Sequence, residues 1–264
     1  MNDIAPDDPL ASFRLDDRLI VITGASEGIG RTFAENFARA GAHIVLVSRR
    51  RDKLEDVRRA IMAHDGKADI VATDVRQVGE IRALAEAVRR LVQGDDRKLV
   101  LVNNAGFGFT KPAVEVTEED WHTTFETHAK GAFFCSQQIG ALMLERGYGK
   151  IINMSSTWAV ATQAGKSVYC SAKAAIGQLT AALSTEWAPR GVRVNALAPT
   201  TTTTDFVKDM AAKNPARFEE LRSRIKLGRF ADPSELVGAA IYLASGASDF
   251  VTGQTLFVDG GFTT

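Results

Sequence analysis

The sequence has only two cysteines, Cys135 and Cys170, and four histidines in 264 residues. Two separated cysteines are too few for a disulfide framework, and the scattered histidines show no paired metal-ligand spacing. We therefore expect no metal site and no disulfide-stabilised fold, and we interpret Cys170 as a packing residue.

The chain also lacks a net charge and a long apolar run. Lysine plus arginine and aspartate plus glutamate both number 32, so no overall field attracts nucleic acid or an anionic membrane. The dense basic run at 49–51 is followed at once by acidic residues. No apolar stretch approaches the length of a membrane span. Residues 1–17 carry prolines and aspartates rather than a basic and then apolar signal, so we expect a flexible leader on a cytoplasmic protein.

Strand and helix patterns alternate through the rest of the sequence, whose 45% apolar content suffices for a sizeable core. Buried strands are expected at 19–23, 43–47, 69–72, 99–103, 150–154, 193–197 and 255–258. Helices are expected between them at 28–40, 53–64, 79–92, 118–146, 168–188 and 233–245. Repeated βα units with near-continuous apolar strands predict one α/β domain over residues 18–264. Its doubly wound, Rossmann-like parallel sheet would lie between two layers of helices.

A glycine-rich segment follows the first expected strand. Gly24, Gly28 and Gly30 stand between that strand and a helix, which is the context that a dinucleotide-binding turn requires. Gly24 permits a tight turn, Gly28 lets the backbone approach a pyrophosphate, and Gly30 lets the helix pack closely on the strand. The N-terminus of the helix offers free N–H groups to phosphates. The segment therefore predicts a nucleotide-binding turn.

A second motif places Tyr169 and Lys173 four residues apart in an expected helix, where positions i and i+4 share a face. A cation close to a phenol favours the phenolate and draws its pKa from about 10 toward neutrality. Such a phenol exchanges protons with an alcohol or a carbonyl. Ser156, thirteen residues before Tyr169, is placed to hold the same substrate oxygen. These three residues are the candidate catalytic group.

The motifs share one position relative to the expected sheet. In doubly wound sheets, ligands bind beyond the carboxyl ends of the strands. The segments that follow expected strand ends are 24–30, 104–106, 155–156 and 199–204. All of them are expected at the same edge.

Together these motifs resemble the short-chain dehydrogenase/reductase family, in its single-domain branch of 3-oxoacyl reductases and sugar-alcohol dehydrogenases. The matching segments are Thr23–Gly30 (TGxxxGxG), Asn103–Gly106 (NNAG), Ser156, Tyr169–Lys173 (YxxxK), Pro199–Thr204 (PGxxxT) and Val258–Gly261. They occur in the family's order and cover nearly the whole chain.

The resemblance implies reversible hydride transfer between nicotinamide C4 and a carbinol or carbonyl carbon. In that reaction Tyr169 is the general acid and base, and Ser156 holds the substrate oxygen. Lys173 lowers the pKa of the phenol and binds the nicotinamide ribose. The resemblance also implies a homo-oligomer, as a tetramer, and a small-molecule substrate.

The end of the second expected strand predicts NADP(H) in preference to NAD(H). Ser48 stands where NAD-preferring relatives place an aspartate, and Arg49 follows it. A guanidinium beside a small hydroxyl suits a 2′-phosphate. Glu27 argues the other way, because many NADP-preferring relatives carry a basic residue there. The resemblance adds these expected cofactor contacts: Ser26, Glu27, Ile29, Asp74, Val75, Asn103, Ala105, Gly106, Thr202 and Thr204, besides Tyr169 and Lys173.

Two departures from the family pattern leave alternatives open. His128 stands in the position of the family's asparagine, and Thr200 in the position of the glycine after Pro199. These substitutions support a second hypothesis, in which the protein is a cofactor-binding scaffold or sensor with reduced catalytic activity. The substrate stays open between a 3-oxoacyl thioester and a sugar or polyol. The expected pocket residues are Phe107, Phe109, Thr157, Trp158 and the lid-like segment 205–225.

Overall fold

The computed structural model of the chain describes Asp8 and residues 10–264. Seven strands form one sheet in the order β3-β2-β1-β4-β5-β6-β7, and every neighbouring pair is parallel. The strands are β1 Arg18–Thr23, β2 His43–Ser48, β3 Lys67–Ala72, β4 Lys98–Asn103, β5 Gly149–Met154, β6 Val192–Pro199 and β7 Thr255–Val258. The predicted doubly wound parallel sheet is confirmed.

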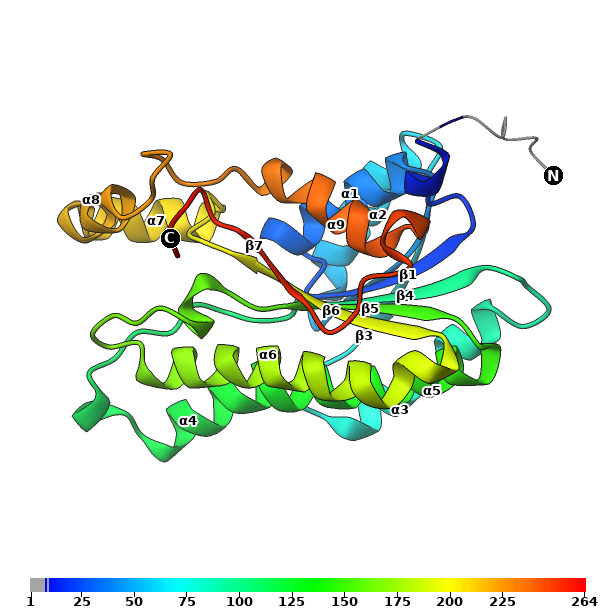
Figure 1. Cartoon of the computed structure of the whole chain (residues 1–264), viewed down its shortest axis with the longest axis horizontal. Helices are drawn as coiled ribbons and strands as arrows, with labels where there is room; N and C mark the ends of the chain where they lie inside the picture. Colours follow the sequence, from blue (N-terminus) through cyan, green and yellow to red (C-terminus); the bar gives the residue numbers. More distant parts are fainter. Residues whose placement is uncertain (1–7, 9) are drawn as a thin grey trace.

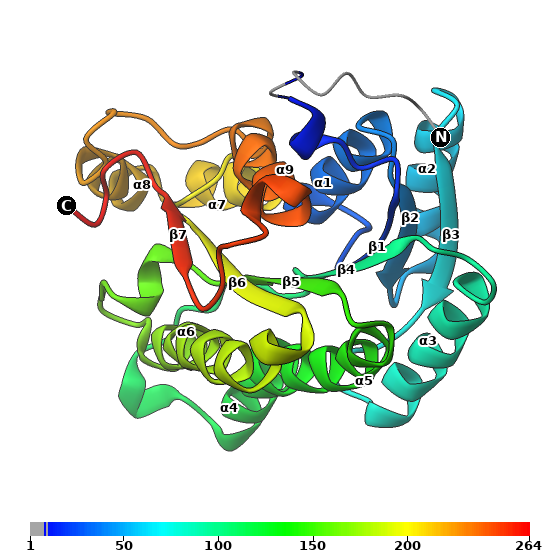
Figure 2. The same ribbon diagram turned by 45° about the vertical axis from the view of Figure 1, so that its right-hand side comes forward.

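Helices cover both faces of this sheet, as Figures 1 and 2 show. On one face lie α1 Gly28–Arg39, α2 Arg51–Met62 and α9 Val237–Ala244. On the other lie α3 Val78–Leu91, α5 Gly131–Arg146 and α6 Ser167–Trp187, with α4 Glu118–Phe125 beside α6. The three-layer arrangement follows from strands that are apolar on both faces and need cover on each.

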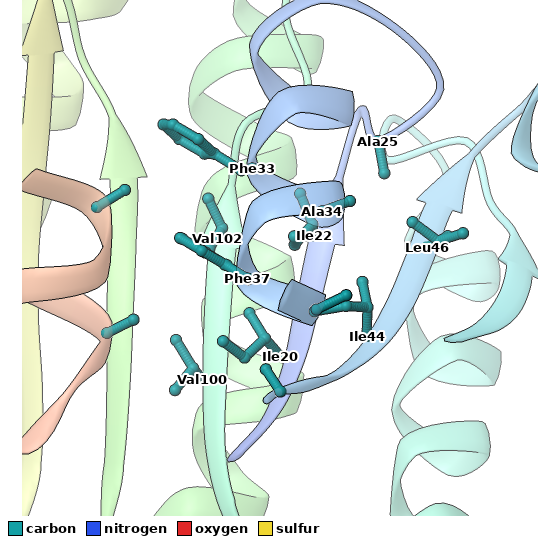
Figure 3. Close-up of a cluster of buried hydrophobic side chains, with 14 of the residues drawn as sticks. Ile20, Ile22, Ala25, Phe33, Ala34, Phe37, Ile44, Leu46, Val100 and Val102 are labelled. Carbon is teal, nitrogen blue, oxygen red and sulfur yellow. The ribbon is translucent and has the colours of Figure 1, made fainter. Parts of the chain in front are cut away.

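Alternation of side chains along the strands divides the core into two layers. Ile20 and Ile22 of β1 point toward α1, where Phe33 and Phe37 stack with ring centroids 5.5 Å apart (Figure 3). Leu19 and the other alternate residues of β1 belong to the layer beneath α3 and α5. The central strands are therefore buried on both faces, so packing on each side holds their carboxyl ends in place.

Three local features differ from the expected elements. The expected long helix at 118–146 contains a π-helical turn, Glu126–Lys130, between α4 and α5. The last expected helix begins as a 3-10 helix, Pro233–Leu236, whose N-cap Asp232 forms a capping box with Glu235. The lid-like segment contains two helices that the sequence patterns did not indicate, α7 Asp205–Lys213 and α8 Pro215–Ser223. Both lie beyond the end of the sheet at which β6 finishes (Figure 1).

The expected leader at 1–17 falls partly outside the described residues, since 1–7 and 9 are not described. Within its described part, Ala11–Phe13 forms a 3-10 helix and the side chain of Leu15 is fully buried in the core layer beneath α1. The packed part of the chain thus begins before Arg18. Across the described range, no helix combines the length and the apolar character needed to cross a membrane.

Candidate active site

The order of the strands reverses between β1 and β4, so the turn after β1 lies beside the loop after β4. Hydrogen bonds join the two. The Thr23 hydroxyl accepts from the backbone N–H groups of Asn104 and Ala105, both at 3.0 Å. The Asn104 amide donates to the carbonyls of Thr23 at 3.0 Å and Gly24 at 3.2 Å. Thr23 and Asn104 therefore hold the glycine turn against the NNAG loop.

Two glycines of the turn leave no space for a side chain. A Cβ at Gly30 would lie 2.3 Å from the carbonyl oxygen of Gly24. Gly24 itself has φ +68°, and a Cβ there would lie 2.9 Å from the Cα of Ala105. Gly28, at φ +55°, opens α1 with a hypothetical Cβ 3.3 Å from Thr204. The N-terminus of α1 thus lies at the carboxyl edge of the sheet, and without side chains at these glycines a ligand can approach its backbone N–H groups closely. This arrangement fits a bound pyrophosphate.

The three candidate catalytic residues meet at the same edge of the sheet, after β5, which is separated from β1 by β4. Ser156 follows β5, and its hydroxyl accepts from the N–H of Trp158 at 3.2 Å. Tyr169 and Lys173 lie one turn apart on α6, with Lys173 Nζ 5.8 Å from the centroid of the Tyr169 ring. Lys173 is buried, and its ammonium donates to the carbonyl of Met154 at 2.7 Å. The end of β5 and one face of α6 therefore present a hydroxyl, a phenol and an ammonium together.

Burial sets the pKa values of this group. It raises the pKa of Tyr169 to about 12, although a hydrogen bond with the Ser156 side chain acts in the opposite direction. It lowers the pKa of Lys173 to about 8. The expected lowering of the phenol pKa is not found in this geometry. The free energy lost by removing the phenolate from water is larger than the stabilisation that the neighbouring groups give it.

Comparison with known proteins agrees with this geometry. A family model described as Enoyl-(Acyl carrier protein) reductase matches residues 24–263. A NAD-dependent glycerol dehydrogenase of Listeria innocua is 34% identical over 95% of this chain and 96% of its own length. The chain belongs to the short-chain dehydrogenase/reductase family.

Two further members of the family are similar over almost their whole length. Gluconate 5-dehydrogenase of Gluconobacter oxydans is 35% identical over 95% of this chain and 96% of its own. The crystal structure of a gluconate 5-dehydrogenase from Burkholderia cenocepacia in complex with NADP and tartrate is 37% identical, with a TM-score of 0.90. That similarity covers 97% of this chain and 99% of the other. The chain is thus a short-chain oxidoreductase of the type that acts on alcohol and carbonyl groups.

In the region after β2, Arg50 makes contacts that the sequence did not predict. Arg50 donates to the hydroxyl of Ser26 at 2.9 Å and pairs with Glu27 at 2.8 Å. Its backbone N–H donates to the hydroxyl of Ser48 at 3.2 Å. Arg49, the residue that the sequence predicted, is exposed, as is Arg50. In a run of three arginines the sequence carries no signal for which one turns toward the glycine turn.

Other expected cofactor residues have side chains that contact protein. Asp74 binds the guanidinium of Arg76 through both carboxylate oxygens, which lowers the pKa of that carboxyl. Val75 is buried in the core layer beneath α3 and α5. The amide of Asn103 donates to the oxygens of Ser136 and Asn153, so it links β4 to α5 and β5. Ile29 packs against the core from α1.

The threonine segment after β6 reaches back over the glycine turn. Thr202 pairs with Ala231 in an isolated bridge, and its hydroxyl donates to the carbonyl of Thr200 at 3.0 Å. Thr204 caps α7 by accepting from the N–H of Val207 at 3.4 Å, and its side chain faces Gly28. Among the described residues, Asp65 is the one non-glycine with positive φ, so Thr200 stands in a backbone conformation that does not require glycine.

The structure places His128 in contact with the candidate catalytic tyrosine. Its ring meets the Tyr169 ring edge-on with centroids 5.4 Å apart, and its Nε2 lies 3.0 Å from the carbonyl oxygen of Phe107. A Cβ at Gly106 would lie 2.5 Å from the imidazole. Burial and the charge of Lys173 hold the pKa of His128 well below its usual range. His128 is therefore a neutral spacer between the NNAG loop and Tyr169.

Proposed function

We propose that this protein transfers a hydride between a nicotinamide cofactor and a secondary alcohol or its ketone, with Tyr169 as general acid and base. The convergence of Ser156, Tyr169 and Lys173 at the sheet edge onto which the glycine turn also opens carries the proposal. In reduction, the nicotinamide supplies a hydride to the carbonyl carbon and the Tyr169 hydroxyl gives its proton to the carbonyl oxygen. In oxidation, both transfers run in reverse.

Each residue has a distinct part in this reaction. The Ser156 hydroxyl holds the substrate oxygen, where negative charge develops, and so stabilises the transition state. With a pKa of about 12, Tyr169 is a neutral phenol near neutral pH, which is the form that donates a proton during reduction. Oxidation needs the phenolate, and a positive charge near the hydroxyl, such as that of Lys173, favours it.

We infer a preference for NADP(H). Arg49 and Arg50 bring two guanidinium groups to the end of β2, where Ser48 stands in place of the aspartate of NAD-preferring relatives. The carboxylate of Glu27 would repel a 2′-phosphate, but its ion pair with Arg50 balances that charge. The relatives divide on this point, since one is NAD-dependent and another was crystallised with NADP. Ser48→Asp is expected to raise the KM for NADP and to lower that for NAD, through repulsion of the 2′-phosphate.

A small polyhydroxylated substrate is favoured over an acyl thioester. The similar glycerol and gluconate dehydrogenases act on such molecules according to their names, and one similar structure holds tartrate. Trp158 and Tyr169 belong to a hydrophobic cluster with Leu221, Ile225 and Phe262. Two cations also contact this pair, Lys166 over the Tyr169 ring and Arg224 over the Trp158 ring, and these charges favour a polar substrate.

A panel of sugar alcohols, sugar acids and ketones, assayed with both cofactors by the absorbance of the reduced nicotinamide, tests the proposal. We expect turnover that Tyr169→Phe abolishes while the cofactor still binds. Cofactor binding without turnover of any substrate would instead support the alternative of a scaffold or sensor.

We further propose a homo-oligomer, as a tetramer. The aromatic side chains of Trp121 on α4 and Phe133 on α5 are 45% and 36% exposed. Strand β7 pairs with β6 alone within the described chain, so its outer edge is open to a second copy. Light scattering coupled to size-exclusion chromatography measures the state, and a monomer at micromolar concentration would contradict the proposal.

A further inference from the structure

Two basic side chains lie at the outer end of the active site, beyond Tyr169. Lys166 immediately precedes α6, and its Nζ lies 5.0 Å from the centroid of the Tyr169 ring. Arg217 projects from α8, and its guanidinium donates to the side-chain oxygens of Gln163 at 3.3 Å and Thr110 at 3.4 Å. The backbone N–H of Lys166 donates to the carbonyl of Gln163. Lys166 therefore lies in the turn that begins at Gln163, and Arg217 reaches the same turn from α8.

Neither charge has an acidic partner within the described part of the chain, in contrast to other basic groups nearby. Lys111 pairs with Asp120 at 2.6 Å, and Lys208 pairs with Asp205 at 3.2 Å. Lys166 and Arg217, both partly buried, form ion pairs with none of the described residues. Burial lowers the pKa of Lys166 to about 8, and the charge of Arg217 acts in the same direction. Two like charges that repel each other in a partly buried position are a ready receptor for an anion.

The position of Lys166 limits where that anion sits on the substrate. Because its ammonium lies against the ring of the proton donor, an anion bound there is separated by only a few atoms from the carbon that exchanges the hydride. A 3-oxoacyl thioester is uncharged in that part, and the phosphate of a pantetheine arm is far from its keto group. A short hydroxy or oxo acid has both groups at the required separation. Guanidinium groups also bind carboxylates in a bidentate manner.

We propose that Lys166 and Arg217 bind the carboxylate of a short-chain sugar acid, so that the substrate is a polyhydroxy acid and its keto acid. This inference rests on the proposed function and names its substrate class. It gives α8 a role, because Arg217 on that helix contacts Gln163 in the turn before α6.

Carbon-matched pairs test the proposal: D-gluconate against D-glucitol, and L-threonate against L-threitol. The variants are Lys166→Met and Arg217→Gln, with Lys213→Met, an exposed lysine of α7, as the matched control. We expect the wild type to prefer each acid over its polyol. Each variant should lose about tenfold in kcat/KM for the acid, mainly through KM, and less than about twofold for the polyol. Lys166→Arg and Arg217→Lys should keep most of the preference.

Equal use of acid and polyol by the wild type, or equal losses for both substrates in the variants, would overturn the proposal. Calorimetric titration of the same acids and polyols decides the matter even if no pair is turned over. The wild type should bind the acids more tightly than the polyols, and the two variants should not. Absence of hydride transfer to every substrate, with acid binding that still depends on Lys166, would refute the proposed function alone. Tighter binding of sugar phosphates than of sugar acids would overturn the proposal of a carboxylate and show that the two basic residues bind a phosphate.

Discussion

The two halves of the active site are built by different means. On the cofactor side, backbone geometry determines the shape: Gly24 and Gly30 leave no room for a Cβ, and hydrogen bonds between Thr23 and Asn104 hold the turn. On the substrate side, partly exposed side chains from separate segments meet, as with Arg217 over Gln163. The glycine turn tolerates almost no change, whereas the substrate side can change its ligand by exchanging single side chains.

The strongest test of this contrast is at the residue where the halves meet. Tyr169→Phe removes the proton donor and leaves the glycine turn untouched. We expect kcat to fall by about a thousandfold, because a positioned acid contributes on that order. The affinity for the cofactor, measured by fluorescence of the reduced nicotinamide, should change little. Tyr242→Phe on α9 is the control, and near-normal turnover of Tyr169→Phe would refute the mechanism.

A second variant challenges the rigidity of the cofactor half. Gly30→Ala places a Cβ 2.3 Å from a backbone oxygen, so the turn or the helix must shift. We expect the KM for the cofactor to rise about tenfold or more and the melting temperature to fall. The control is Gly79→Ala on α3, where nothing lies within 4 Å of the new Cβ and alanine favours the helix. Unchanged cofactor binding in Gly30→Ala would remove the contrast between the halves.

The boundary between the halves is tested by His128. His128→Ala leaves a space beside the Tyr169 ring, and we expect kcat to fall about tenfold through loss of position. His128→Asn should retain more activity, because it keeps a polar side chain there. Since His128 stays neutral, the acidic limb of the pH profile of kcat should be the same in His128→Asn as in the wild type. A shift of that limb would mean that the imidazole titrates during turnover.

The smallest expected effect concerns pH on the substrate side. Because the pKa of Lys166 is lowered to about 8, its charge is present below that pH and is lost as the pH rises through it. The groups that face it are Tyr169 and Cys170 on its own helix and Arg217 from α8. We expect the KM for a sugar acid to rise a few-fold above about pH 8, and that for the matched polyol to stay constant. Lys166→Arg should abolish the rise, and a rise for both substrates would place its origin elsewhere.

The same contrast explains what the sequence could predict. The strands, the glycine turn and the order of the motifs were predicted because each depends on local pattern or on backbone geometry that few residues allow. Other contacts depend on tertiary packing and could not be predicted. They are the hydrogen bond from Arg50 to Ser26, the inward side chain of Asn103 and the approach of Arg217 to Gln163. The other helices were predicted from the alternation of strands and helices along the chain. Helices α7 and α8 were missed because they follow each other with no strand between them.

The hydrogen bonds from Asn104 to Thr23 connect positions 81 residues apart in the chain. The glycine turn therefore has its full set of hydrogen bonds only when β4 is paired with β1, and three βα units precede β4 in the chain. A fragment that ends before β4 would contain the whole glycine motif and still lack the groups that give it its shape. Cofactor binding at this turn, as proposed above, would therefore report long-range assembly during folding, because the turn has its shape only when β1 and β4 are paired.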